Sequence, residues 1–249
     1  MSFIEQRRID NLLNGLHRDT PVFRIFSCKR FLQLLKESKL SLIKPKKWDD
    51  PFENFILSTP AIDNHGTPIS LSSLSESYFG QCWTLNKETD AMWRIYSPYK
   101  DGIKVSTTVG KLFDVFYDHR KEPELECYFG LVEYKTEQNL INLLLRAKEF
   151  VLDRSGIESA KSLLLKREEF SHEAEARLIY VSFCEDEKSR DVYSFTIDPN
   201  TLFDDITLDP RISDSDQKKI SDEITINGCT LNILKSSLYS LPNFKIVLQ

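Results

Sequence analysis

The sequence lacks the features that mark several large classes of protein. Its five cysteines form no CxxC pair and are odd in number, so no disulfide framework is expected. The four histidines are far apart, with neither HExxH nor zinc-like spacing, which argues against a structural metal. No apolar run approaches the roughly 20 residues of a membrane span, and the start "MSFIEQRRID" has no apolar signal core. We therefore expect a cytoplasmic protein with reduced thiols, no bound metal and no membrane contact.

An excess of positive charge is also missing. The formal net charge is -5 and the pI is near 5.5, so the whole chain exerts no general electrostatic pull on nucleic acid. A local basic groove is compatible with an acidic protein. A macromolecular partner, protein or nucleic acid, therefore stays open.

Glycine is sparse, with 8 residues, and neither an internal repeat nor a low-complexity linker interrupts the chain. This pattern predicts a single domain over residues 1–249, with an N-terminal helix over 1–20 and a helical insertion at 136–169. Periodicity predicts further helices at 27–38, 86–99, 111–119 and 214–224, and strands at 21–26, 39–43, 78–84, 102–110, 127–134, 176–183, 191–197 and 244–249. Because helices and strands mix without strict βαβ alternation, the expected fold is α+β, with mixed, mostly antiparallel sheets and flanking helices.

The stretch "FSHEAEARLIY" sets two carboxylates close together at the start of an expected strand. Alternation along a strand places Glu173, Glu175 and Arg177 on one face and the intervening alanines on the other. The pattern fits either a solvated strand end, where Arg177 neutralises the acids, or the floor of an active site. His172 falls on the opposite face and is not expected to act as an acid or base.

Arg24 in "VFRIF", Ser106 in "GIKVSTTVG" and the Glu173-x-Glu175 pair follow one another along the chain. This order resembles that of the arginine-serine-glutamate ADP-ribosyltransferases. The resemblance implies a related fold and NAD as substrate. It also implies that Glu175 stabilises the positive charge on the ribose, that Glu173 orients or deprotonates the acceptor, and that Ser106 braces the catalytic carboxylate. Arg24 would bind the pyrophosphate, and Trp93 or Tyr96 would stack on nicotinamide.

The turn "WDDPFE" can be interpreted in two ways. Pro51 and Asp50 favour a structural turn anchored by Trp48 and Phe52, whereas its acids could instead face a pocket. The cysteines are not accompanied by a histidine motif, so a thiol nucleophile is not expected.

Six short motifs in order, "FRIF", "LSLIKPKKWDDPFE", "CWT", "MWRIY", "GIKV" and "FSHEAEARLIY", resemble a mainly bacterial family, domain-of-unknown-function family 2971. The likeness extends over roughly residues 22 to 212, with Asp49 and Asp209 where Asn and Gly are typical. The positions shared with that pattern are Arg24, Asp50, Pro51, Phe52, Glu53, Trp93, Tyr96, Gly102, Glu173, Glu175 and Arg177. The family brings no established function, and many of the shared positions are polar, which favours a site over packing.

Three hypotheses follow from the sequence. The first is an NAD-dependent ADP-ribosyltransferase, a toxin or phage-defence effector that modifies a cytosolic macromolecule. The second is a non-catalytic binding or regulatory module. The third is a magnesium-dependent nuclease with Asp50, Glu53, Glu173 and Glu175 as oxygen ligands, although the chain has no ExK or DxD core.

Overall fold

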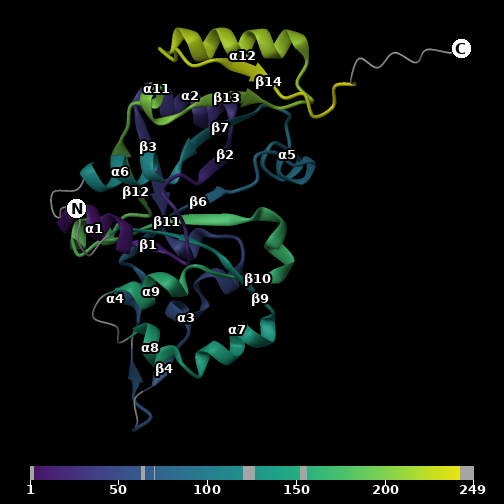
Figure 1. Ribbon diagram of the computed structural model, residues 1–249. Coiled ribbons are helices and arrows are strands. Elements are labelled where there is room, and N and C mark those ends of the chain that lie inside the picture. The colour runs from purple at the N-terminus through teal and green to yellow at the C-terminus, as the bar shows by residue number, and fades with distance from the viewer. Residues whose placement is uncertain (1–2, 63–64, 70, 120–126, 152–155, 242–249) are drawn as a thin grey trace, which may run out of the picture.

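The computed structural model describes residues 3–62, 65–69, 71–119, 127–151 and 156–241 (Figure 1). The strand predicted at 244–249 lies outside these residues. The α-helices are α1 (Phe3–Asp10), α2 (Cys28–Glu37), α3 (Phe55–Ser58), α4 (Ser72–Ser75), α5 (Asp90–Tyr96), α6 (Val109–His119), α7 (Glu137–Leu144), α8 (Ala147–Val151), α9 (Ile157–Ser162), α10 (Glu185–Lys188), α11 (Pro199–Leu202) and α12 (Asp214–Ile226). Three short 3-10 helices are η1 (Pro45–Lys47), η2 (Pro51–Asn54) and η3 (Glu168–Glu173).

The strands are β1 (Leu12–Leu13), β2 (Pro21–Ser27), β3 (Lys39–Ile43), β4 (Ala61–Ile62), β5 (Pro68–Ile69), β6 (Tyr78–Thr84), β7 (Gly102–Thr108), β8 (Cys127–Leu131), β9 (Glu133–Lys135), β10 (Leu165–Arg167), β11 (Glu175–Val181), β12 (Val192–Thr196), β13 (Asp205–Leu208) and β14 (Ile233–Lys235). Within the described residues, ten of them form one sheet with the order β1-β8-β11-β6-β2-β7-β13-β14, and β3 and β12 branch from β6. Within this sheet most neighbours are antiparallel, and among its described strands only β1–β8 and β13–β14 are parallel. The α+β class, with a mostly antiparallel sheet, is confirmed.

Local sequence chemistry explains the helix that follows the first long strand. The Ser27 side chain caps α2 by accepting a hydrogen bond from the backbone N–H of Arg30, as the sequence predicts. Phe31, Leu34 and Leu35 form its buried face. Ser38 then adopts φ 51°, and this left-handed residue turns the chain into β3.

Alternation along β11 gives the sheet two different faces. Ala176 and Leu178 point into the main core, which also contains buried residues of α2, α6 and α12. Ile179 and Val181 point to the other side, where they pack in a second cluster with residues of α9. Figure 1 shows α3, α7, α8 and α9 gathered below β11 and α12 at the opposite end. The functional groups described below lie on the same face of β11 as Ile179.

The sheet splits next to β6. β2 pairs with β6 at Phe23 and Thr84, whereas β3 pairs with β6 at Ile43 and Gly80. Because β2 and β3 meet β6 at opposite ends of the strand, they diverge, and α2 connects them. Arg24 follows Phe23 at the point where β2 leaves β6.

Two predicted segments differ from the structure. The N-terminal helix ends at Asp10, and Leu12–Leu13 instead pair with β8. Within 136–169 the structure has the separate helices α7, α8 and α9, but Leu165–Arg167 form a strand that pairs in parallel with β9. Short-range periodicity did not reveal either pairing, since both partners are distant in sequence. Among the described residues, no helix has the length and apolar character needed to cross a membrane.

Gly80 is required by the packing of Trp48 over the sheet. A Cβ atom at Gly80 would overlap Cζ2 of Trp48 and would lie 3.1 Å from its Cη2. The Trp48 ring in turn lies 4.4 Å from the guanidinium carbon of Arg177. We expect Gly80→Ala to lower the free energy of unfolding by about 1–3 kcal/mol, measured by chemical denaturation. In the double variant, Trp48→Phe should recover part of this loss, because the smaller ring leaves room for the added methyl group. If the losses of the two single variants simply add in the double variant, the Trp48 ring does not clash with the added methyl group.

Candidate active site

A small cavity brings together residues from four separate segments of the chain. Its volume is about 120 Å³, and its walls include Arg24 from β2, Tyr96 from α5, Glu173 from η3 and Glu175 from β11. Cys82 and Thr84 of β6 complete the wall between β2 and β11. The two acids therefore share a concave site with the arginine, rather than lying on an open face far from it.

Glu175 is a buried carboxylate held by two cations. Its Oε2 accepts a hydrogen bond of 2.7 Å from Arg177 Nη2 and lies 3.3 Å from Lys166 Nζ. Burial acts to raise the pKa of Glu175, but the charges of Arg177 and Lys166 outweigh it, so the pKa lies below its usual value. Glu175 is thus a fixed negative charge at neutral pH.

Arg177 is completely buried, which excludes the solvated ladder considered for the Glu-x-Glu-x-Arg pattern. Its Nη2 also donates to Glu53 Oε1 at 2.6 Å, and its Nη1 donates to the carbonyl of Leu163 at 2.7 Å. Burial opposes the charged form, yet the neighbouring carboxylates raise the pKa of Arg177. The guanidinium ties the turn that carries Glu53 to the strand that carries Glu175.

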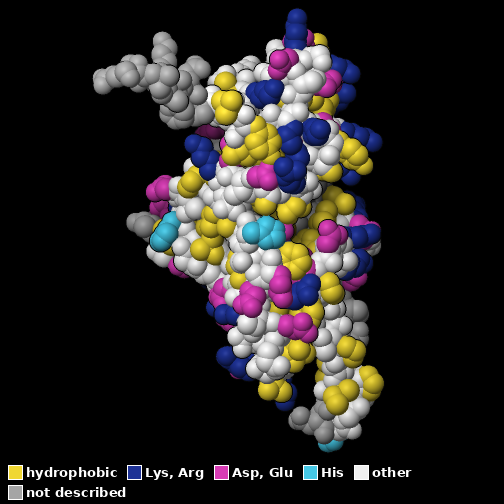
Figure 2. All heavy atoms as spheres, turned by 90° about the vertical axis from the view of Figure 1, so that its right-hand side faces the viewer, with side chains coloured by type: hydrophobic (Ala, Val, Ile, Leu, Met, Phe, Trp, Pro, Cys, Tyr) yellow, Lys and Arg dark blue, Asp and Glu magenta, His cyan; other side chains and the backbone are white. Residues whose placement is uncertain are grey.

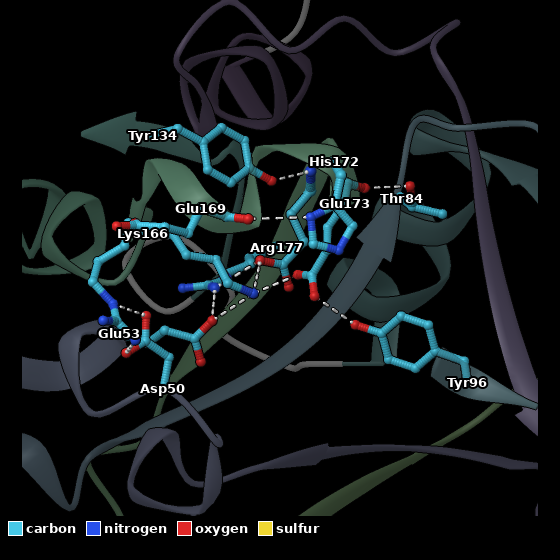
Figure 3. Close-up of polar contacts among 12 residues, drawn as sticks. Asp50, Glu53, Thr84, Tyr96, Tyr134, Lys166, Glu169, His172, Glu173 and Arg177 are labelled. Carbon is cyan, nitrogen blue, oxygen red and sulfur yellow. Dashed lines mark hydrogen bonds and ion pairs between the residues drawn. The ribbon is translucent and has the colours of Figure 1, made fainter. Parts of the chain in front are cut away.

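Lys166 is the centre of the acidic cluster. Its ammonium contacts Glu53 Oε1 at 2.8 Å, Glu175 Oε2 at 3.3 Å and Glu173 Oε2, and its side chain is 7% exposed. Burial acts to lower the pKa of Lys166, but the surrounding carboxylates raise it. Three carboxylates thus share two cations, Lys166 and Arg177 (Figure 3).

Glu173 reaches this cluster from outside the strand. β11 begins at Glu175, and Ala174 has φ 43°, so Glu173 belongs to η3 and not to the pleat in which the sequence places it. The left-handed turn nevertheless brings its carboxylate to Lys166 and to the Tyr96 hydroxyl, which donates to Oε1 at 2.9 Å. Burial raises the pKa of Tyr96, and the adjacent Glu173 charge raises it further.

The backbone around the two acids is fixed by side chains that the sequence reasoning missed. The Thr84 hydroxyl donates to the Glu173 carbonyl, and the Glu175 N–H donates to the Tyr134 hydroxyl at 2.8 Å. Burial raises the pKa of Tyr134 to about 12, so this phenol is neutral. Thr84 is the last residue of the "CWT" motif, and that motif is the feature of the sequence that could have identified it as a site residue. Lys166 and Tyr134 have no local signal, because their role depends on non-local pairing.

Arg24 is the cation without a carboxylate partner in this cavity. Its Nη1 is buried and has no hydrogen-bond partner among the described residues, and its guanidinium carbon lies 5.1 Å from the Phe26 ring. Burial lowers the pKa of Arg24, while the nearby Glu175 charge acts in the opposite direction. A buried guanidinium nitrogen without a partner is costly, and an anionic ligand is the group that would satisfy it.

Two predicted site residues lie elsewhere. Ser106 is three strands from Glu175 along the pairing Ser106–Phe23–Thr84–Glu175, and its hydroxyl donates to Asp205 Oδ2 at 2.6 Å. It therefore does not brace Glu175. Trp93 is buried, and its Nε1 donates to Glu88 Oε1 at 2.7 Å, so it cannot stack on a ligand in this cavity. Of the two aromatic candidates, Tyr96 alone lines the cavity.

In the "WDDPFE" turn, Asp50 and Glu53 have different surroundings, and neither lines the cavity described above. Asp50 caps η2 through the N–H of Phe52 and pairs with Arg167 at 3.0 Å, which is a structural role. Glu53, in contrast, points into the acidic cluster (Figure 3). His172 is exposed, and its Nδ1 lies 3.3 Å from the Glu169 carbonyl oxygen.

In the described part of the chain, no group of three or more His, Cys, Asp or Glu side chains is arranged to hold a metal ion. The Lys166 ammonium occupies the position between Glu53, Glu173 and Glu175 that a bound cation would need. Asp50 faces Arg167 instead of these acids. The four oxygen ligands of the nuclease hypothesis are therefore engaged by side-chain cations.

Removal of Lys166 should make stability depend strongly on pH. In Lys166→Met, Arg177 still pairs with Glu53 and Glu175 but Glu173 loses its cation, so at least one carboxylate should bind a proton in the folded state. A raised folded-state pKa means that stability is lost as pH rises through it. We expect the loss relative to wild type to be about 3–5 kcal/mol at pH 8 and clearly smaller at pH 5, measured by urea denaturation.

Lys161→Met provides the matched control for this prediction. Lys161 pairs with Glu158 at 2.6 Å near the surface, with its side chain 38% exposed. Its loss should cost less than about 1 kcal/mol and should not vary between the two pH values. An equal loss at pH 5 and pH 8 for Lys166→Met would show that the carboxylates do not take up the proton.

The comparisons with known proteins agree with the family resemblance. A family model described as "Protein of unknown function (DUF2971)" matches residues 92–178, which include "MWRIY", "GIKV" and the start of "FSHEAEARLIY". No curated protein sequence matches the chain.

Solved structures of DarT from Thermus sp. 2.9 are similar in outline. The complex with NAD+ aligns with TM-score 0.40 at 10% identity, covering 89% of this chain and 98% of that chain. The complex with ADP-ribosylated ssDNA aligns with TM-score 0.42 at 10% identity, covering 90% and 97%.

Proposed function

We propose that this chain is an NAD-dependent ADP-ribosyltransferase that modifies a macromolecular acceptor. The observation that carries the proposal is one cavity lined by Arg24, Glu173, Glu175 and Tyr96. It combines a buried guanidinium nitrogen that has no partner among the described residues with a carboxylate whose pKa is lowered. The reaction needs a cation for the pyrophosphate and a fixed negative charge beside the ribose.

The residues present fit the substrate. The orphaned Nη1 of Arg24 would gain the partner that it lacks when a pyrophosphate oxygen reaches it. Tyr96 and Met92 provide flat and apolar surface in the same cavity for the nicotinamide ring. Tyr96 replaces Trp93 in this proposed role because the Trp93 ring is enclosed by the core.

Glu175 is suited to stabilise positive charge and not to carry a proton. Arg177 and Lys166 keep it ionised, and together with Glu53 they hold it in one position. As the bond between nicotinamide and ribose breaks, the electron pair leaves with nicotinamide and positive charge develops on the ribose. A preorganised carboxylate beside that charge lowers the barrier.

Glu173 is the residue that we assign to the acceptor. One of its oxygens accepts from Tyr96 and the other contacts Lys166. The acceptor nucleophile would form the new bond to the ribose carbon from which nicotinamide leaves, and its proton would pass to Glu173. The acceptor of this proposal is a protein or a nucleic acid.

Basic side chains lie mainly in the upper half of the face that bears α5, and acidic side chains lie mainly in the lower half (Figure 2).

The test uses NAD labelled in the adenylate half, incubated with the purified chain and, in separate reactions, with single-stranded DNA, RNA and a protein extract. We expect release of nicotinamide and transfer of label to one of these acceptors. If the folded chain neither releases nicotinamide nor transfers label, the enzyme proposal is wrong.

A role as a toxin or phage-defence effector stays a prediction. Expression of the active chain should halt growth, and expression of an inactive variant should not.

A further inference from the structure

A second cavity lies on the other side of Arg24. It has a volume of about 270 Å³ and is lined by residues of β2, α2, β3, β6 and β12, among them Phe26, Gln33, Ile43, Gln81 and Val192. Arg24 lines both this cavity and the acidic one. The second cavity occupies the split between β2 and β3, where the two strands diverge from β6.

Neither cavity alone has the size of a usual small-molecule site, which is about 300–1,000 Å³. A dinucleotide consists of two nucleosides joined by a pyrophosphate. The two cavities match this arrangement, because both are lined by Arg24, whose Nη1 has no partner among the described residues. The acidic cavity contains the groups that act on the ribose of nicotinamide, so the other nucleoside must lie elsewhere.

We propose that the cavity between β2 and β3 binds the adenosine half of NAD. Phe26, Leu34, Leu40, Ile43 and Val192 offer apolar surface to a flat heterocycle. The Gln81 amide bridges the Trp83 ring nitrogen and the Ser41 carbonyl at 2.8 and 2.9 Å, which fixes the floor of the cavity. Gln33 on α2 adds an amide at the opposite wall. This proposal rests on the proposed function and extends it to the second half of the substrate.

The experiment fills the second cavity and measures the two halves of the substrate separately. Val192 is 46% exposed, so Val192→Trp can narrow the cavity without disturbing the core. Gln33→Trp narrows it from α2. Thr196→Trp, an exposed position on the same strand that does not line the cavity, is the matched control. Calorimetry measures binding of NAD, ADP, nicotinamide mononucleotide and inorganic pyrophosphate to wild type and to each variant.

We expect both cavity variants to weaken ADP binding at least tenfold and to leave nicotinamide mononucleotide binding within twofold of wild type. The control should bind all probes as wild type does. Unchanged ADP affinity in the cavity variants, or wild-type affinity for pyrophosphate equal to that for ADP, would overturn the adenosine assignment while leaving the enzyme proposal intact. If wild type binds neither NAD nor ADP, both proposals fail together.

Discussion

Glu175→Gln should reduce nicotinamide release from NAD by about 10³-fold while the protein remains folded, because the amide keeps the shape of the carboxylate and removes its charge. Arg177 and Lys166 retain Glu53 as a partner, at 2.6 and 2.8 Å, so neither cation is left alone. The loss of stability should therefore stay near 1–3 kcal/mol, at about the cost of one charged hydrogen bond. Steady-state release of nicotinamide and a urea denaturation curve measure the two effects.

Glu169→Gln is the control for this result. Glu169 is exposed on η3, four residues from Glu173, and does not line the acidic cavity. Its replacement should leave the rate within twofold. Wild-type activity in Glu175→Gln would contradict the assigned role, as would a rate that falls only in proportion to the unfolded fraction.

Arg24→Met should have opposite effects on stability and on binding. Arg24 is half-buried, and its Nη1 is buried without a hydrogen-bond partner among the described residues, whereas methionine fills similar space without a charge. We expect the free energy of unfolding to rise by about 1–2 kcal/mol and NAD affinity to fall by about 10–100-fold, the equivalent of a charged hydrogen bond. Denaturation without ligand measures the expected rise in the free energy of unfolding, and calorimetry with NAD measures the expected fall in affinity.

Arg146→Met is the matched control, because Arg146 is an exposed arginine whose ion pair with Glu149 lies on the surface. It should change stability by less than about 1 kcal/mol and leave NAD affinity unchanged. A lower stability of Arg24→Met together with wild-type NAD affinity would mean that Arg24 is a structural residue and not a ligand of an anion.

Local patterns in the sequence predicted the elements better than their arrangement. The Ser27 cap, the buried face of α2 and the alternation of β11 all depend on residues within a few positions of one another, and each is present in the structure. Glu173 departs from the alternation because a left-handed residue, Ala174, separates it from the strand. Alternation is informative only where the strand is continuous.

The composition of the site was harder to predict because strand order does not follow chain order. Ser106 looked like the bracing hydroxyl, yet β7 is separated from β11 by β2 and β6, and Thr84 of β6 is the hydroxyl residue paired with Glu175. Lys166 comes from β10, outside the main sheet, and reaches the acids only through the pairing of β10 with β9. Non-local contacts of this kind leave no periodic trace in the sequence.

The most direct test of the account is a crystal structure of the slow Glu175→Gln variant soaked with NAD. Pyrophosphate oxygens should lie within hydrogen-bond distance of Arg24 Nη1, with the nicotinamide riboside beside residue 175 and Glu173. NAD bound at another surface, or a saturating soak that leaves both cavities flanking Arg24 empty, would contradict the proposal that these residues form a dinucleotide site.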